Sequence, residues 1–307
     1  MEASRLWRGG CEVSDELDAI DAKLIAGFRQ GLEILTTEVA DFIRSQDRDP
    51  LPGSQATREL LAFPHEDALS VSWSSAFILI ELGAEHVSVF LKTLKAPIEN
   101  IACCTCIRSM LEACSIGAWL VDPAIDPEIR AKRAFAYRYE GMSQQLTLAQ
   151  TVKANPGEIQ KCKDRIDQVE NRACALGFPK VVNKRGERIG IGQQMPSATS
   201  IIELVMGDPH AYRLLSAVAH GHMWAITQLC YKKAESIKPS PGYYHLEKSL
   251  NIKGFAMLSV SAISALSRPV WNLSRYFGWD LLRIEEIFEK AADAMELDNS
   301  FRFWRSP

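Results

Sequence analysis

The sequence predicts an all-α protein, an irregular multi-helix bundle that folds as a single domain over residues 1–307 and carries one short β-hairpin insertion. Apolar residues recur at spacings of three and four over long stretches, as on the buried face of a helix. Prolines and capping residues stand where these stretches begin and end. A hydrophobic fraction of 47% is enough to bury a core. Because the chain has no internal repeat and no long linker, we expect one folding unit.

The N-terminal half predicts three long helices. The first begins after Ser14, which is a suitable N-cap, and its apolar positions run from residue 17 to 43. The second spans residues 66–94 and is apolar or small on nearly every face, so we expect it to be a central helix surrounded by others. The third begins at Pro97 and ends near Val121.

The second half continues with helices, interrupted once. Residues 179–192 alternate β-branched and charged side chains around a Lys-Arg-Gly turn, which is typical of an exposed β-hairpin, and this is the one segment that we predict as strand. The N-cap and first-turn proline at Asp208 and Pro209 predict one helix that continues to about Lys233. Further helices are expected at residues 127–152, at 156–176, from 197, in a long segment kinked at Pro269, and at 280–295.

Composition limits the classes of partner and the compartment. A formal net charge of -3 argues against a protein that coats nucleic acid or anionic membrane without specificity, because such proteins carry a large basic excess. The longest apolar stretches, at residues 71–90 and 255–271, are interrupted by charged or polar side chains, and no secretory signal is evident, so we expect a cytoplasmic protein with no membrane partner. The eight cysteines are irregularly spaced and are expected to be reduced.

The segment from residue 207 to 226 carries the strongest functional pattern. Arg213, Ser216, His220 and Trp224 are spaced three, four and four apart, which places them on one face of the predicted helix. Arg213 and His220 would lie about 10 Å apart along its axis. A guanidinium can stabilise charge on phosphoryl oxygens and an imidazole can move protons, so the pair could cleave RNA through its own 2′-hydroxyl without metal. The alternative is a satisfied polar network inside the bundle.

A second pattern lies on the helix predicted from Pro97. Arg108 and Glu112 form an i, i+4 pair that shares a stripe with apolar residues, so both charges are expected to be partly buried. Glu112 could orient Arg213 or His220 from the neighbouring helix. The alternative is a structural or surface ion pair.

These two patterns together resemble a known group of proteins. The residues that carry the resemblance are Arg108-x-x-x-Glu112, Trp119-Leu120, Asp122-Pro123 and Tyr212-Arg213-x-x-Ser216-x-x-x-His220-Gly221. Over residues 98–230 this pattern resembles a group of uncharacterised bacterial helical proteins, and arginine followed after six residues by histidine is similar to the HEPN superfamily of helical ribonucleases and toxins. That resemblance implies an RNA-cleaving site, often completed across a dimer, with Arg213 and His220 as the matching positions. Leu214 stands where active members usually have a polar residue.

Two basic clusters could line a path for RNA. The first contains Arg130 and Arg133 on a predicted helix, and the second contains Lys184 and Arg185 on the hairpin. The alternative is that both are ordinary solvated charges. No spacing of cysteines and histidines suits a metal, and no phosphate-binding glycine motif is present, so we expect no cofactor and no metal.

The sequence therefore supports two hypotheses of different classes. The first is a HEPN-like protein that acts on nucleic acid, in the sharpest form a metal-independent ribonuclease with RNA as partner and a homodimer as assembly. Its catalytic residues would be Arg213 and His220, supported by Arg108, Glu112, Tyr212 and Ser216. The second is a noncatalytic helical module that binds a protein partner or a small ligand, such as a toxin–antitoxin or defence component or a regulatory subunit.

Overall fold

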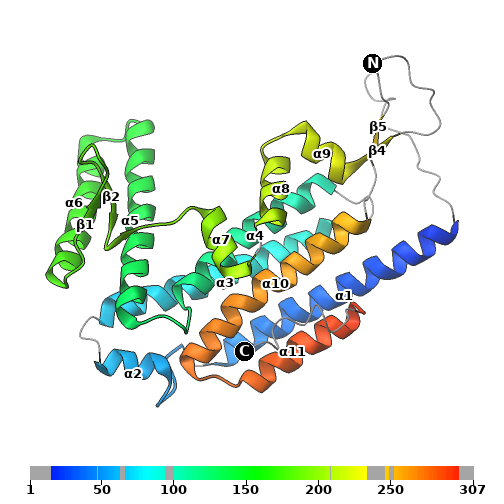
Figure 1. Ribbon diagram of the computed structural model, residues 1–307, viewed down its shortest axis with the longest axis horizontal. Helices are drawn as coiled ribbons and strands as arrows, with labels where there is room; N and C mark the ends of the chain where they lie inside the picture. The colour runs from blue at the N-terminus through cyan, green and yellow to red at the C-terminus, as the bar shows by residue number, and fades with distance from the viewer. Residues whose placement is uncertain are drawn as a thin grey trace.

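The computed structural model describes residues 15–46, 48–62, 66–93, 100–207, 209–233, 246–248 and 252–296. Helices dominate this part of the chain, which confirms the predicted all-α class with a short hairpin insertion (Figure 1). The helices are α1 (Asp15–Ser45), α2 (Gln55–Ala62), α3 (Glu66–Thr93), α4 (Asn100–Leu120), α5 (Pro127–Thr151), α6 (Pro156–Ala175), α7 (Ala198–Met206), α8 (His210–Ala219), α9 (Met223–Cys230), α10 (Ile252–Phe277) and α11 (Leu281–Ala294). The strands are β1 (Lys180–Val182), β2 (Arg188–Ile191), β3 (Gln193–Gln194), β4 (Tyr231–Lys233) and β5 (Leu246–Lys248).

The central helix of the bundle is α4, which packs against α3, α10, α7 and α8 (Figure 1). The prediction that α3 is surrounded on every side was wrong, because Ile78, Leu82 and Val89 are 65%, 40% and 44% exposed along one of its faces. The opposite face of α3 lies against α4 at Gly83, where a Cβ atom would come within 2.3 Å of the Cys114 sulfur. A missing side chain thus allows the close approach of the two helices.

Helices α1 and α11 lie side by side at the outer edge of the bundle (Figure 1). Their contact also depends on glycine, since a Cβ atom on Gly31 would lie 2.5 Å from the carbonyl oxygen of Ala291. The buried side chains Leu32 and Leu35 of α1 and Phe288 of α11 join the main hydrophobic core. The long N-terminal helix predicted from its apolar spacing is therefore confirmed, whereas Ser14 lies outside the described residues.

Residues 127–194 form an arm that projects from the bundle in Figure 1 and consists of α5, α6 and β1–β3. The arm has a small core of its own, in which Phe135 and Tyr139 of α5 meet Ile166 and Val169 of α6. β1 and β2 pair antiparallel, as predicted for the hairpin, and β3 adds a short third strand beside β2. The turn is closed by a hydrogen bond from the Gly186 N–H to the carbonyl oxygen of Asn183, 3.0 Å long.

Side-chain capping explains where several helices begin. α6 begins after Asn155, whose side chain accepts a 2.9 Å hydrogen bond from the Glu158 N–H, and α11 begins after Asp280 in the same manner. Helix α2 was not predicted from the sequence, and it follows directly after the prolines at positions 50 and 52. Its signal was the N-cap Ser54, whose hydroxyl accepts from the Thr57 N–H at 3.2 Å. Pro97 and Asp208 lie outside the described residues.

The structure contains a second pair of strands and a long helix that includes a proline. The hairpin was expected to be the one strand segment, but β4 and β5 pair antiparallel, and β4 occupies residues that we expected to be helical. Pro269 lies inside α10, which continues through it over 26 residues. Because β4 directly follows the short helix α9 and its partner strand begins 13 residues after it ends, no local pattern could indicate the pairing.

Two helices of the described chain, over Ala68–Thr93 and Ile101–Leu120, are long and apolar enough to cross a membrane. The buried core helix of a protein outside a membrane passes the same test, and 56% of the α4 window is buried inside the molecule. The cytoplasmic location and the absence of a membrane partner therefore stay predictions.

Candidate functional site on helices α4 and α8

The segment predicted as one helix over residues 209–233 is broken in the middle. Gly221 has a φ of 76°, a left-handed conformation that favours glycine. The Gly221 N–H donates to the Val218 carbonyl at 3.0 Å and the His222 N–H donates to the Ala217 carbonyl at 2.9 Å. This pair of bonds is a Schellman motif, which ends α8 and lets α9 begin in a new direction. Trp224 consequently does not share a helical face with Arg213, in contrast to the prediction.

The two predicted catalytic side chains both lie at the surface of α8. Arg213 and His220 are exposed and Ser216 is half-buried. The helical period still places the three on one face, because His220 is the residue at which α8 ends and its N–H donates to the Ser216 carbonyl at 2.9 Å. Within the described chain no hydrogen bond or ion pair joins Arg213 to His220. Both groups are therefore open to solvent and able to meet a ligand.

Glu112 connects α4 to this face of α8. Its Oε1 atom accepts a 2.7 Å hydrogen bond from Arg108 Nη2 and a 2.5 Å hydrogen bond from the Tyr212 hydroxyl. The Arg108 guanidinium carbon also lies 5.6 Å from the centre of the Tyr212 ring. Burial, and then the hydrogen bond to the Glu112 carboxylate, raise the pKa of the Tyr212 phenol. Glu112 thus reaches α8 through Tyr212, the residue before Arg213, rather than through Arg213 or His220.

The resulting polar face consists of Arg108, Glu112, Tyr212, Arg213, Ser216 and His220, and we call it the α4–α8 face. Its inner part is half-buried, since the Arg108 and Glu112 side chains are 22% and 27% exposed. The Arg108 Nε atom is buried and makes no hydrogen bond. Its outer part, on α8, is solvated. The hydrogen bond from Tyr212 to Glu112 fixes the residue directly before Arg213, and a hydrogen-bonded neighbour of this kind helps to hold an adjacent side chain in position.

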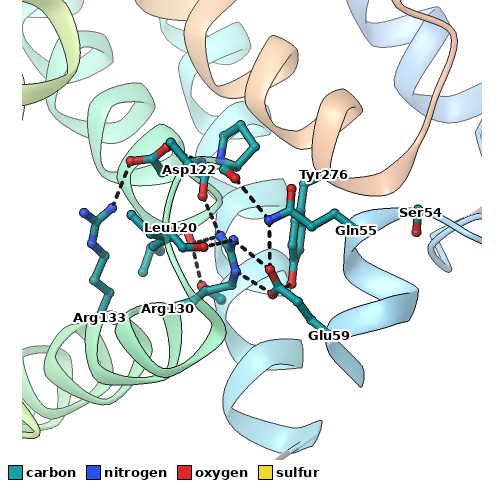
Figure 2. A network of polar contacts seen from close by, with 12 residues as sticks. Ser54, Gln55, Glu59, Leu120, Asp122, Arg130, Arg133 and Tyr276 are labelled. Carbon is teal, nitrogen blue, oxygen red and sulfur yellow. Dashed lines mark hydrogen bonds and ion pairs between the residues drawn. The ribbon is translucent and has the colours of Figure 1, made fainter. Parts of the chain in front are cut away.

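Arg130, which we expected to bind nucleic acid, is instead completely buried, so that prediction was wrong. Its Nε atom donates to Glu59 Oε2 at 3.0 Å, and the centre of the Tyr276 ring lies 4.0 Å from its guanidinium carbon (Figure 2). The Tyr276 hydroxyl donates to the same Glu59 oxygen at 2.6 Å. Arg130 Nη2 also donates to Glu59 Oε1 at 3.3 Å, and the remaining hydrogen bonds of Arg130 go to the carbonyl oxygens of Leu120, Asp122 and Ile125. The cation therefore joins α2, α5 and α10 at the end of α4.

Arg133 is also occupied within the protein. Its Nη1 atom donates to the Trp119 carbonyl at 2.5 Å and its guanidinium carbon lies 5.0 Å from the Trp119 ring. The same Nη1 atom lies 3.5 Å from the Asp122 carboxylate (Figure 2). Burial lowers the pKa of this guanidinium. Arg130 and Arg133 together satisfy carbonyl groups at the C-terminus of α4, which a cation favours. This role could not be predicted from the sequence, because it depends on how the turn after Leu120 brings the C-terminus of α4 against α5.

Lys184 and Arg185 are exposed at the tip of the hairpin, as predicted for solvated basic residues. The neighbouring Arg188 forms ion pairs with Asp167 and Glu170 at 3.1 and 2.8 Å. Figure 1 places the hairpin on the arm and α8 on the bundle, so Lys184 and Arg185 belong to a different part of the molecule from the α4–α8 face. That Lys184 and Arg185 line a path for RNA stays a prediction.

Other features of the described chain do not add to the α4–α8 face. A pocket of about 310 Å³ lies in the arm and is lined by Tyr139, Ser143, Leu146, Lys163, Ile166, Asp167 and Arg188. No group of three or more histidine, cysteine, aspartate or glutamate side chains in the described part of the chain could hold a metal ion. Cys103 and Cys114 are free thiols, and burial raises their pKa values to about 11 and about 12. Such thiols behave as apolar packing groups.

Comparison of the chain with protein-family models, with curated proteins and with solved structures finds no match. The resemblance to HEPN proteins therefore depends on the motif residues of α4 and α8.

Proposed function

We propose that the protein acts on RNA at the α4–α8 face, as a metal-independent ribonuclease. The observation that carries the proposal is the cluster of Arg108, Glu112 and Tyr212, which ties α8 to α4 directly before an exposed Arg213, with an exposed His220 at the end of the same helix. A purely structural network would have its charged members enclosed, as Arg130 is, whereas here the two side chains with phosphate chemistry point to solvent.

Arg213 would bind the scissile phosphodiester. A guanidinium forms paired hydrogen bonds with phosphoryl oxygens and stabilises the charge that grows on them during attack. Arg213 has no ion-pair partner among the described residues, so its donors are available to the phosphate. Tyr212, fixed by Glu112 at 2.5 Å, holds this turn of α8 against α4 and so positions the adjacent arginine.

His220 would carry the proton transfer. It takes the proton of the ribose 2′-hydroxyl as this oxygen attacks phosphorus, and the 5′-oxygen leaves with a proton from water. The products are a 2′,3′-cyclic phosphate and a new 5′-hydroxyl end, with no metal required. Ser216 lies one turn before His220 on the same face and offers a hydroxyl to the phosphate or to the imidazole.

The competing function is a noncatalytic binding module, and one observation favours it. Met223 and Trp224, directly after the α8–α9 turn, are 63% and 60% exposed, which is typical of a contact surface. A homodimer that completes the site across two copies also stays part of the proposal.

The test is RNA turnover in the presence of a chelator. Purified protein with excess EDTA should convert an unstructured RNA to fragments with cyclic phosphate ends. His220→Ala should lower the rate by about 100-fold or more, as expected for loss of a general base, and Arg213→Ala should do the same with an unchanged helical circular-dichroism spectrum. Turnover that persists in His220→Ala would contradict the proposed role, and no turnover of varied RNAs would favour the binding module.

A further inference from the structure

Trp224 is an unusual side chain for its position on the first turn of α9. It is 60% exposed, whereas Trp119 and Trp279 are nearly buried and the other described tryptophans, Trp73 and Trp271, are half-buried. An indole is among the largest apolar surfaces that a protein can bury, and here it is left largely in water. One exposed aromatic residue needs no explanation by itself. The residues around Trp224 decide whether its exposure indicates a binding site.

The turn between α8 and α9 brings Trp224 close to the α4–α8 face. The His222 N–H is bonded back to Ala217 of α8 at 2.9 Å, and the Ala225 N–H is bonded to the His222 carbonyl at 3.0 Å. The chain therefore changes direction within this turn, and Trp224 lies four positions after His220 in the sequence. Even fully extended, four residues span at most about 14 Å. A short oligonucleotide that contacts His220 can reach Trp224.

The charge around Trp224 selects the kind of partner. Residues 209–231 contain no aspartate or glutamate. The exposed polar side chains with ionisable groups in this segment are Arg213 and the histidines at positions 210, 220 and 222. The nearby carboxylate of Glu112 is engaged by Arg108 and Tyr212. A partner that suits this surface has negative charge and a flat apolar face, and both occur together in unpaired nucleotides.

We propose that Trp224 is a stacking platform for an unpaired base, so that the α4–α8 face accepts single-stranded RNA and discriminates against duplex. This inference rests on the proposed function, because Arg213 is taken to hold the phosphodiester beside that base. In a duplex each base face is covered by its neighbours, and the ring of Trp224 can then contact only the edge of the helix. The indole therefore acts in selection of the substrate, separately from the proton transfer at His220.

Binding can be measured apart from turnover in a His220→Ala background. The probe is a fluorescein-labelled dodecauridylate, followed by fluorescence anisotropy, beside a 12-base-pair RNA duplex of the same label. Trp224→Ala should weaken binding of the single strand by roughly tenfold, because a base then loses its stacking contact with the indole. Trp224→Phe should retain most of the affinity because a phenyl ring also stacks. Duplex binding should be weaker and insensitive to both changes.

Leu282→Ala is the matched control, because Leu282 is 72% exposed on α11 and tests removal of an exposed apolar side chain elsewhere. It should leave the affinity unchanged. Equal affinity of Trp224→Ala and the parent for the single strand would overturn the inference while leaving RNA binding intact. Binding that depends on Trp224 without any turnover by the wild type would retain the inference and refute the ribonuclease. No binding of either RNA would overturn both, and the exposed surface would then suit a protein partner.

Discussion

Replacing Glu59 with alanine tests the network that anchors the arm to the bundle (Figure 2). Arg130 is 0% exposed and its charge is neutralised by this one carboxylate. The substitution removes four hydrogen bonds to Glu59, which come from Arg130 Nε, Arg130 Nη2, the Tyr276 hydroxyl and Gln55 at 3.0, 3.3, 2.6 and 2.9 Å. The three carbonyl groups that Arg130 also contacts supply only partial charges. Arg130 would consequently stay buried with no counter-ion.

Removal of one member of a buried ion pair lowers the free energy of unfolding by about 3–5 kcal/mol. At roughly 2 °C per kcal/mol for a chain of this size, the midpoint of thermal unfolding should fall by about 6–10 °C. Far-UV circular dichroism during heating is the assay. Glu286→Ala is the control, because both side chains of the ion pair between Glu286 and Arg283 are exposed. This substitution should change the midpoint of thermal unfolding by less than about 2 °C.

A second variant separates loss of charge from loss of packing. Glu59→Leu combined with Arg130→Met removes both charges and fills similar volume, so it should recover part of the stability lost in Glu59→Ala. The recovery is incomplete because the carbonyl groups of Leu120, Asp122 and Ile125 lose their donor. A midpoint for Glu59→Ala within 2 °C of the wild type, as in the control, would refute the conclusion that this network is the anchor.

Three further predictions concern the turn, the thiols and the inner layer of the α4–α8 face. Gly221→Ala should lower the free energy of unfolding by about 1 kcal/mol or more, because the φ of Gly221 is positive. Gly141→Ala, inside α5, should instead raise the free energy of unfolding by a few tenths to about 1 kcal/mol. Urea titration measures both changes, and equal effects of the two substitutions would contradict the left-handed turn at Gly221. Iodoacetamide at pH 8 should label the exposed Cys174 and leave Cys114 unlabelled, as mass spectrometry can show. Rapid labelling of Cys114 in the folded protein would show that its thiol is open to solvent. Burial raises the pKa of Cys114 from 9.0 to about 12, so its neutral thiol adds stability below pH 9 that is lost as the pH rises toward 12. Tyr212→Phe should lower RNA turnover several-fold and the free energy of unfolding by about 1 kcal/mol, because Glu112 then keeps only its hydrogen bond from Arg108. Unchanged turnover would argue that the hydrogen bond between Tyr212 and Glu112 does not position Arg213.

The sequence predicted most helices because apolar spacing and capping are local properties. The helices expected at residues 156–176 and 280–295 begin where Asn155 and Asp280 cap them, because a cap acts on the turn that directly follows it. The break at Gly221 was harder to predict, because a glycine inside a helical pattern is often tolerated and its positive φ depends on bonds to Ala217 and Val218.

Residues that act over long sequence separations could not be placed from the sequence. Arg130 and Arg133 look like any basic pair on a helix, yet their partners are carbonyl groups of α4 and a glutamate 71 positions away. Glu59 and Tyr276 carried no signal for the same reason, because they meet only after α2 and α10 pack together. The i, i+4 pair of Arg108 and Glu112 was readable, while its link to Tyr212 required the contact between α4 and α8.

The most direct test of the central claim is cleavage of an unstructured RNA by the wild type and by His220→Ala, both in excess EDTA. The account predicts fragments with 2′,3′-cyclic phosphate ends from the wild type and a rate lower by about 100-fold or more in the variant, which should keep its helical spectrum. Equal rates in the two proteins, or a complete dependence on added metal, would contradict it.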